Sequence, residues 1–324
     1  MDTAEHPAAR LTGRLPRQVD VYEVGPRDGL QNELRIVPLE GKLRLIAALV
    51  AAGERRIEAT SFVSPRWIPQ LSDAEDVLRA LPPVPGVIYS ALVPNMKGLD
   101  RARAAGLAEA AVFISASESH SRKNINKSIA EALSVAAEVT RGALAAGMRV
   151  RAYLSVVWGC PYEGPVSLER VVELCRRLVD LGIYQLSLGD TIGVGVPNQT
   201  EEILAALTRY IPVEKMALHL HDTRGLALAN ALIGLQAGVS TFDASIGGLG
   251  GCPYAPGAAG NLATEDLVNM LERMGVETGI DLPKLVEAGE VAQELIGRKL
   301  SGKYLQAALG ERDRAQARRR ATSS

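Results

Sequence analysis

Residues 19–33, with the sequence VDVYEVGPRDGLQNE, hold the pattern from which the predicted fold is built. The alternating apolar residues at 19–22 predict a β-strand, and the Gly25-Pro26 pair that follows ends the strand abruptly. Arg27 and Asp28 come directly after this break. A guanidinium and a carboxylate are therefore placed together at the end of a strand, on a fixed rim.

The rest of the chain repeats this unit, because short β-branched runs alternate with segments of helical period. Candidate strands lie at residues 19–24, 56–60, 87–93, 110–115, 149–157, 183–188, 216–221 and 240–245. Candidate helices lie at residues 39–52, 73–80, 97–105, 126–146, 167–181, 199–210, 226–236 and 264–274. Several of these helices are followed by a glycine, such as Gly53 and Gly182, at the C′ position where glycine commonly ends a helix.

Eight strand–helix units without a hairpin signal favour a parallel sheet. Right-handed crossovers repeated eight times close such a sheet into an α/β (β/α)8 barrel, a TIM barrel. An open, doubly wound sheet is the alternative, and the length and the strand count favour the barrel. We expect an N-terminal extension (1–18), the catalytic barrel (19–280), a C-terminal helical extension (281–310) that packs on the barrel or on a second subunit, and a polar, frayed tail (311–324).

Composition excludes several classes of function. The net charge is −1 and aromatic residues make up 4% of the 324 residues, which argues against a nucleic-acid partner. No window approaches the roughly 18 apolar residues of a membrane span, and residues 1–18 lack the apolar core of a secretory signal. The three cysteines have no paired or metal-finger spacing. We expect a cytoplasmic protein; the sequence leaves the oligomeric state open, with a homodimer as one candidate.

In a barrel of this type, chemistry lies at the C-terminal ends of the strands. His219 and His221 close the seventh candidate strand, and residues i and i+2 of a strand share one face. Two neutral imidazoles side by side suit a divalent metal ion. The alternative is a pair of hydrogen-bonded core histidines, but only four histidines occur in the chain and two of them stand here.

Two further residues could complete a metal site. Asp28 supplies a carboxylate across the barrel mouth, and Asn261 can supply an amide oxygen. A mixed oxygen and nitrogen set fits six-coordinate Mg²⁺ or Mn²⁺ better than tetrahedral zinc. The alternatives are a salt bridge from Asp28 to Arg27 and a helix N-cap at Asn261.

Other residues at the predicted mouth are candidates for catalysis or substrate binding. Cys252 stands in a glycine-rich loop and can act as an acid or base; an inert buried thiol is the alternative. Asp190 is a candidate general base, or else a helix cap reached through Thr191. Glu23 and Glu58 receive supporting catalytic roles, with structural ion pairs to Arg27 as the alternative. We assign substrate-binding roles to Arg27, Gln31, Ser187 and Thr191.

Taken together, these residues resemble the 3-hydroxy-3-methylglutaryl-CoA lyase family, within a wider group of metal-dependent barrels that includes Claisen-type synthases. The resemblance runs from about residue 19 to residue 309. Its densest segments are EVGPRDGLQNE (23–33), IEATSFVSP (57–65), GCPYEG (159–164), SLGDTIGVG (187–195), HLHDTRG (219–225) and GGLGGCPYAPGAAGNLATED (247–266). The last segment is the most specific, because the synthases differ at this loop and lack its cysteine.

The resemblance implies an acyl-CoA substrate, a divalent cation and a set of roles for individual residues. The cation ligands would be Asp28, His219, His221 and Asn261. Arg27 would hold the thioester or carboxylate side of the substrate, Cys252 would be the catalytic thiol, and Asp190 the base near the hydroxyl, with Glu23 and Glu58 in support. The chain departs from the animal enzymes at Leu34, where they carry a lysine expected near CoA, and at Arg224 and Leu226, where they carry Tyr and Gln. The rival functions are a Claisen-type synthase and a non-catalytic CoA- or metal-binding barrel.

Overall fold

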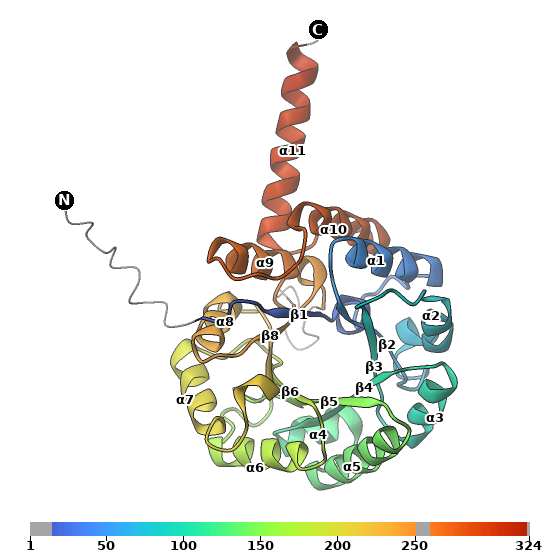
Figure 1. The fold of residues 1–324 in the computed structure, drawn as a ribbon, viewed down its shortest axis with the longest axis vertical. Coiled ribbons are helices and arrows are strands. Elements are labelled where there is room, and N and C mark those ends of the chain that lie inside the picture. Colours follow the sequence, from blue (N-terminus) through green and yellow to red (C-terminus); the bar gives the residue numbers. More distant parts are fainter. Residues whose placement is uncertain (1–14, 251–259, 323–324) are drawn as a thin grey trace, which may run out of the picture.

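The computed structural model describes residues 15–250 and 260–322, and its central element is a closed barrel of parallel strands in the order β1 to β8 (Figure 1). The first strand pairs with the last, with Asp20 opposite Thr241. The strands are β1 (Asp20–Glu23), β2 (Arg56–Ser61), β3 (Ile88–Leu92), β4 (Glu109–Ser115), β5 (Arg149–Ser155), β6 (Gln185–Asp190), β7 (Met216–Leu220) and β8 (Thr241–Ala244). The predicted barrel is confirmed.

Helices surround the barrel and follow the strands in the expected alternation (Figure 1). They are α1 (Leu39–Ala51), α2 (Ala74–Ala80), α3 (Met96–Ala104), α4 (Glu118–Ile125), α5 (Ile129–Ala145), α6 (Leu168–Val179), α7 (Pro197–Leu207), α8 (Ala227–Gln236), α9 (Thr264–Arg273), α10 (Leu282–Ile296) and α11 (Lys303–Thr322). None of the helices in the described part of the chain has the length and apolarity needed to cross a membrane.

The chain after β4 forms two helices where we expected one. Asn126 adopts a left-handed conformation with φ 54°, which ends α4. Ser128 then starts α5, because its side chain accepts from the Glu131 backbone N–H while the Glu131 carboxylate accepts from the Ser128 N–H. The predicted helix at residues 126–146 matches α5, whereas the polar α4 gave no apolar period by which to detect it.

The C-terminal segment differs from the expected frayed tail. Helix α10 packs against α1 and α9, and α11 continues without a break to Thr322. Figure 1 shows α11 projecting away from the barrel. Arg312 of α11 is paired with Glu290 of α10, with Nη1 2.6 Å from Oε2. The segment predicted as a polar tail, residues 311–324, is indeed polar, and its described side chains are exposed, but it is helical as far as Thr322.

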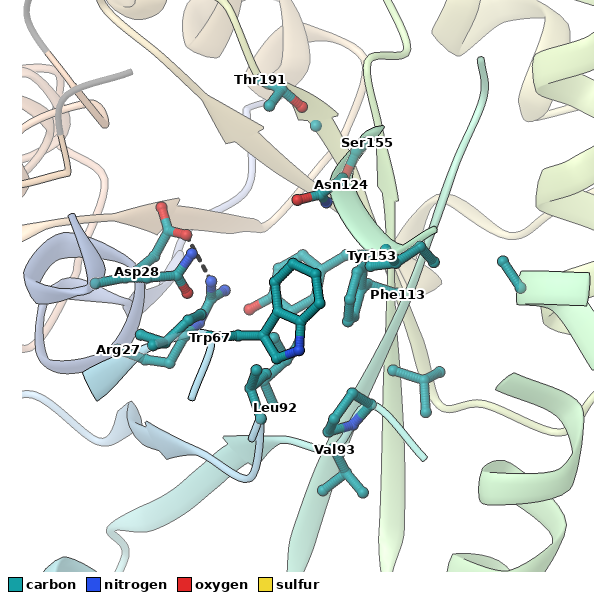
Figure 2. Close-up of a pocket in the computed structure, with 18 of the residues that line it drawn as sticks. Arg27, Asp28, Trp67, Leu92, Val93, Phe113, Asn124, Tyr153, Ser155 and Thr191 are labelled. Carbon is teal, nitrogen blue, oxygen red and sulfur yellow. Dashed lines mark hydrogen bonds and ion pairs between the residues drawn. The ribbon is translucent and has the colours of Figure 1, made fainter. Parts of the chain in front are cut away.

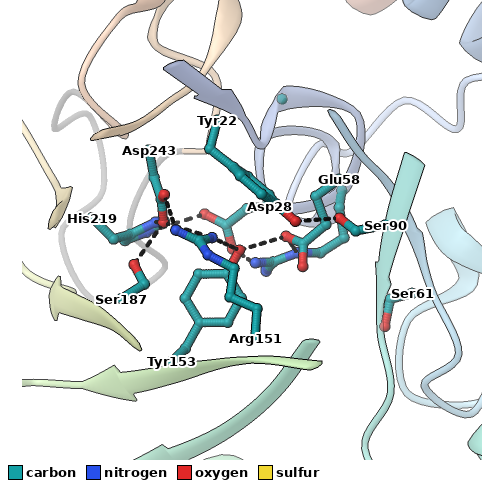
Figure 3. Close-up of polar contacts among 12 residues, drawn as sticks. Tyr22, Asp28, Glu58, Ser61, Ser90, Arg151, Tyr153, Ser187, His219 and Asp243 are labelled. Carbon is teal, nitrogen blue, oxygen red and sulfur yellow. Dashed lines mark hydrogen bonds and ion pairs between the residues drawn. The ribbon is translucent and has the colours of Figure 1, made fainter. Parts of the chain in front are cut away.

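The apolar core lies between the strands and the helices, whereas the inside of the barrel is polar. In the interior, the Tyr22 hydroxyl donates to Ser90 Oγ at 2.6 Å and contacts Glu109 Oε1 at 2.9 Å. Arg151 and Asp243 form a fully buried ion pair in the same space (Figure 3). Barrels of this fold are usually filled by branched apolar residues. Buried polar groups are unfavourable unless they are hydrogen-bonded, so this interior points to a function at the barrel mouth.

Candidate active site

Asp28, His219 and His221 converge at the C-terminal mouth of the barrel. Asp28 lies in a single helical turn, Gly25–Gly29, directly after β1, while His219 belongs to β7 and His221 follows it. One ligand atom from each residue lies within 4.8 Å of the others. His219 Nε2 is 3.3 Å from His221 Nε2 and 3.9 Å from Asp28 Oδ2. The structure thus brings together three of the four predicted ligands.

The protonation states in this cluster suit a cation. Burial by itself would raise the pKa of Asp28. The charge of Arg27, together with His219, His221 and the hydrogen bond from Asn261, outweighs burial and holds that pKa well below its ordinary value. Burial lowers the pKa of His221 to about 4. An ionised carboxylate therefore faces an imidazole that is neutral at pH 7 and has a lone pair to donate. This donor set fits a divalent cation.

Asn261 joins the cluster through its amide nitrogen. Its Nδ2 donates to Asp28 Oδ2 at 2.8 Å and to the Leu249 carbonyl at 3.0 Å. A backbone bridge between His221 and Asn261 holds the two segments together. The N-cap of α9 is Ala263, so Asn261 is not the helix cap that we considered as an alternative.

Arg27 lies beside the cluster in a fixed position. Its Nη1 donates to Asp28 Oδ1 at 2.5 Å (Figure 2). Its Nε donates to Glu58 Oε2, also at 2.5 Å. Tyr153 donates its hydroxyl to Glu58 Oε2 at 3.1 Å, and its ring lies below the guanidinium at 5.5 Å. Burial favours the neutral form of Arg27, but the Glu58 and Asp28 carboxylates raise its pKa further above its ordinary value. Glu58 is thus an ion-pair partner of Arg27, as one of our two interpretations had it.

A cavity of about 630 Å³ opens above this cluster. Its walls include Arg27, Asp28, His219 and His221, together with Gln31 and Thr191, to which we had assigned substrate binding; Trp67, Asn124, Tyr153 and Ser155 also line it (Figure 2). The Thr191 hydroxyl accepts from the backbone N–H of Val156 at 3.0 Å. Val156 has an unusual positive φ of 57° for a β-branched residue, so Thr191 also stabilises a strained turn at the cavity.

Two predicted site residues do not line this cavity. Asp190 Oδ1 and Oδ2 accept from the backbone N–H groups of Val194 and Gly195, both at 2.9 Å. Ser187 donates to Asp243 Oδ2 at 2.7 Å and is fully buried inside the barrel. The expectation that Asp190 points into the mouth is wrong, because residue Gly189 takes the inward position at this end of β6 and the next residue faces outward. Asp190 instead holds the turn after β6.

Glu23 lies outside the barrel, away from Arg27. Its Oε1 accepts from the N–H groups of Gly25 at 2.7 Å and Ile246 at 3.0 Å, and Thr264 Oγ1 donates to Oε2 at 2.7 Å. The proposed ion pair of Glu23 with Arg27 is therefore wrong, since Tyr22 takes the inward position on β1. Glu23 ties the turn that carries Asp28 to the segment after β8.

Glu23 belongs to a cluster of buried carboxyl groups that also includes Glu54 and Glu265. Both Glu54 oxygens are buried without a hydrogen-bond partner among the described residues. Burial raises the pKa of Glu23 to about 7 and that of Glu265 to about 8. The folded protein therefore binds these protons more tightly than the unfolded chain, in which the pKa of Glu is near 4.5.

This cluster predicts a loss of stability as the pH rises. Its contribution is fully present below about pH 4.5 and is lost as the pH rises towards 8. The side chain in Glu265→Gln cannot deprotonate. Over this pH range, the free energy of unfolding of the variant should therefore fall by roughly 3–5 kcal/mol less than that of the wild type. Denaturant unfolding at several pH values measures the difference. Glu138→Gln, on the exposed face of α5, should follow the wild type; identical slopes in all three proteins would contradict the assignment.

The positions at which the chain departs from the animal enzymes do not line the cavity. Leu34 is fully exposed. Arg224 donates to the Ile192 carbonyl at 2.8 Å, so it fastens the loop after β6, and Leu226 precedes α8 as its N-cap. Cys252 lies outside the described residues.

Residues inside the barrel that were not predicted from the sequence support the cluster. His219 Nδ1 is 3.2 Å from Asp243 Oδ2, and Asp243 is paired with Arg151. Tyr153 lies between Arg151 and Arg27. Two of these residues could have been found from the sequence, because Arg151 and Tyr153 have the i, i+2 spacing within a buried strand. The same spacing identified His219 and His221.

Comparison with known proteins agrees with this geometry. Residues 18–292 match the family model described as HMGL-like. The chain is 53% identical over 295 residues to the mitochondrial hydroxymethylglutaryl-CoA lyase of Mus musculus, covering 91% of each chain.

Solved structures are similar over the same length. The HMG-CoA lyase of Bacillus subtilis superposes with a TM-score of 0.89 at 51% identity, covering 90% of this chain and 98% of that one. An HMG-CoA lyase from Acinetobacter baumannii, in complex with coenzyme A and 3-methylmalate, has a TM-score of 0.86 at 40% identity and covers 90% and 95%. The chain therefore belongs to the hydroxymethylglutaryl-CoA lyase family.

Proposed function

We propose that the protein is a carbon–carbon lyase that cleaves 3-hydroxy-3-methylglutaryl-CoA, or a close 3-hydroxy-3-alkylglutaryl-CoA. The products are acetyl-CoA and a 3-oxo acid, which is acetoacetate for the methyl substrate. The observation that carries this proposal is the convergence of Asp28, His219 and His221 beside a fixed Arg27 on one wall of the cavity. Relatives of about half-identical sequence bear the name of this activity.

Cleavage of the C2–C3 bond leaves negative charge on the departing carbon, which spreads to the thioester oxygen as an enolate. A buried guanidinium held by Glu58 and Asp28 does not have to reorganise to meet that charge. We assign this stabilisation to Arg27. Tyr153 and Glu58 keep the guanidinium in place.

Asp28, His219 and His221 would hold a divalent cation, Mg²⁺ or Mn²⁺, with Asn261 as a further candidate ligand. When bound, such a cation lowers the pKa of a substrate hydroxyl and neutralises a carboxylate. Asn261 also orients Asp28 through the hydrogen bond from its Nδ2.

The shape of the cavity and one of the relatives both support an acyl-CoA substrate. The Acinetobacter enzyme has been solved with coenzyme A. In this chain the cavity runs from the cation cluster to Asn124 and Lys127 beside α4. An ammonium and an amide at that wall suit the phosphates of CoA.

The enolate also needs a proton to become acetyl-CoA, and we propose that the thiol of Cys252 supplies it. This role rests on the sequence resemblance. Asp190 is not retained as the base, because backbone N–H groups hold both of its oxygens. The proton of the C3 hydroxyl is therefore assigned to solvent water in the open cavity, and a proton from solvent restores the thiol after each turnover. We further propose a cytoplasmic location, and the homodimer stays a prediction.

A product assay tests the proposed function. Purified protein with Mg²⁺ and 3-hydroxy-3-methylglutaryl-CoA should release acetyl-CoA and acetoacetate in equal amounts. Net consumption of acetyl-CoA with a 3-oxo acid would instead identify a Claisen-type synthase, and no turnover of any 3-hydroxyacyl-CoA would identify a binding protein. Comparing the methyl substrate with one that has a longer C3 branch determines the preferred substituent.

A further inference from the structure

His219 differs from His221 in having a second buried partner. Its Nδ1 lies 3.2 Å from Asp243 Oδ2, on the side of the ring opposite the cation cluster (Figure 3). The Nδ1 atom of His221 is buried and has no hydrogen-bond partner among residues 15–250 and 260–322. Of the two imidazoles, only that of His219 is held by a residue of the barrel interior.

The surroundings of Asp243 determine which proton His219 carries. Ser187 donates to Oδ2 at 2.7 Å, Arg151 Nη1 donates to the same oxygen at 3.2 Å, and Arg151 Nη2 donates to Oδ1. A carboxylate with a guanidinium against both of its oxygens can only accept. His219 must therefore present an N–H at Nδ1. In the neutral ring this leaves the lone pair on Nε2, the atom that faces Asp28 and His221.

Arg151 is immobilised and cannot reach the substrate. It is fully buried, donates from Nε to Gln185 Oε1 at 2.8 Å and from Nη1 to the Tyr153 hydroxyl at 2.8 Å, and stacks 3.9 Å above the Tyr22 ring. It does not line the cavity. A guanidinium fork fixed in this way sets the position of both Asp243 oxygens.

We propose that Asp243, clamped by Arg151, is a positioning residue that fixes the tautomer and orientation of His219 and thereby sets the affinity of the cation site. The proposal rests on the proposed cation-binding role of His219. Carboxylates behind metal-bound imidazoles typically change metal affinity by about 10–100-fold. Asp243 and Arg151 thus act on the reaction through His219, without contact with the substrate.

The first test uses the unaltered protein. In chelator-treated protein labelled with ¹⁵N-histidine, the nitrogen shifts and two-bond couplings at pH 8 identify the tautomer of each ring; a His219→Gln sample assigns the signal. We expect His219 to be protonated at Nδ1. Protonation at Nε2, or a mixture of the two tautomers, would overturn the proposal. The tautomer itself is read in the unaltered protein, and the His219→Gln sample serves only to assign the signal.

The second test measures Mn²⁺ affinity by titration calorimetry. Asp243→Asn should bind Mn²⁺ about 10–100-fold more weakly, because an amide can donate to Nδ1 and favour the wrong tautomer. Glu109→Gln is the matched control: it alters another buried interior carboxylate, which contacts Tyr22 and Tyr184 but not His219, and should bind within about threefold of the wild type.

The outcomes separate this proposal from the proposed function. Folded Asp243→Asn with wild-type affinity would overturn the positioning role alone, while wild-type protein that binds no Mn²⁺ would remove the cation site itself.

Discussion

Arg27→Gln should lower kcat by about 10³-fold with little change in KM, because the charge it meets develops only in the transition state. The guanidinium is preorganised by Glu58 and Asp28, and a glutamine keeps a donor but loses the charge. Steady-state kinetics with the acyl-CoA ester measures both constants.

The control for this variant is Arg56→Gln. Arg56 also pairs with an aspartate, Asp20, but it begins β2 and lies at the opposite end of the barrel. We expect its kcat to stay within about twofold. Melting temperatures must accompany the kinetics, because Arg27→Gln leaves the buried Glu58 without its cation. An increase in KM alone would make Arg27 a binding residue and refute its role in stabilising the enolate.

Removal of the divalent cation should abolish turnover, and addition of Mg²⁺ or Mn²⁺ should restore it. Activation of the substrate hydroxyl by a cation is worth several kcal/mol, so we expect a loss of at least about 10³-fold after chelation. Asp28→Ala and His221→Ala should show the same loss and should not recover at ordinary cation concentrations.

His120→Asn provides the matched control for the histidine substitution. His120 lines the same cavity, but it contacts Ser115 and is not part of the cation cluster. It should keep the Mn²⁺ affinity of the wild type. Equal loss of Mn²⁺ binding in His120→Asn and His221→Ala would show that the effect does not arise from ligation.

The repeating pattern of the sequence was sufficient to predict the barrel. Eight strands were recognisable because each is a short buried run that ends before a helix, as at residues 216–221 for β7. Segments without apolar periodicity were the difficult ones. Helix α4 and the second half of α11 are polar, so their helical structure depends on capping, as at Ser117, and on ion pairs such as Arg312 with Glu290.

Whether a site residue was predicted correctly depended on whether the alternating direction of side chains along its strand was taken into account. His219 and His221 were placed correctly because alternation along β7 was applied to them. The same alternation directs Tyr22 inward and Glu23 outward on β1, and directs Asp190 outward on β6. Applied to β5 and β8, it would have brought Arg151 and Asp243 into the barrel.

The partners of these residues could not be predicted from one strand at a time. Arg151 meets Asp243 across the barrel, 92 positions away in the sequence, and the interaction depends on the closure of β1 on β8. The cavity wall beside α4 depends equally on a turn at Asn126 that only the folded chain reveals.

The most direct measurement of the central claim is turnover as a function of bound Mn²⁺. Chelator-treated protein would be titrated with Mn²⁺, with free ion measured by electron paramagnetic resonance and product by acetyl-CoA release. We predict that turnover rises in proportion to bound Mn²⁺ and saturates at one ion per chain, and that Asp28→Ala and His221→Ala lose both binding and turnover. Full turnover in the metal-free protein, or tight binding that survives both substitutions, would contradict the assignment of this cluster as the catalytic cation site.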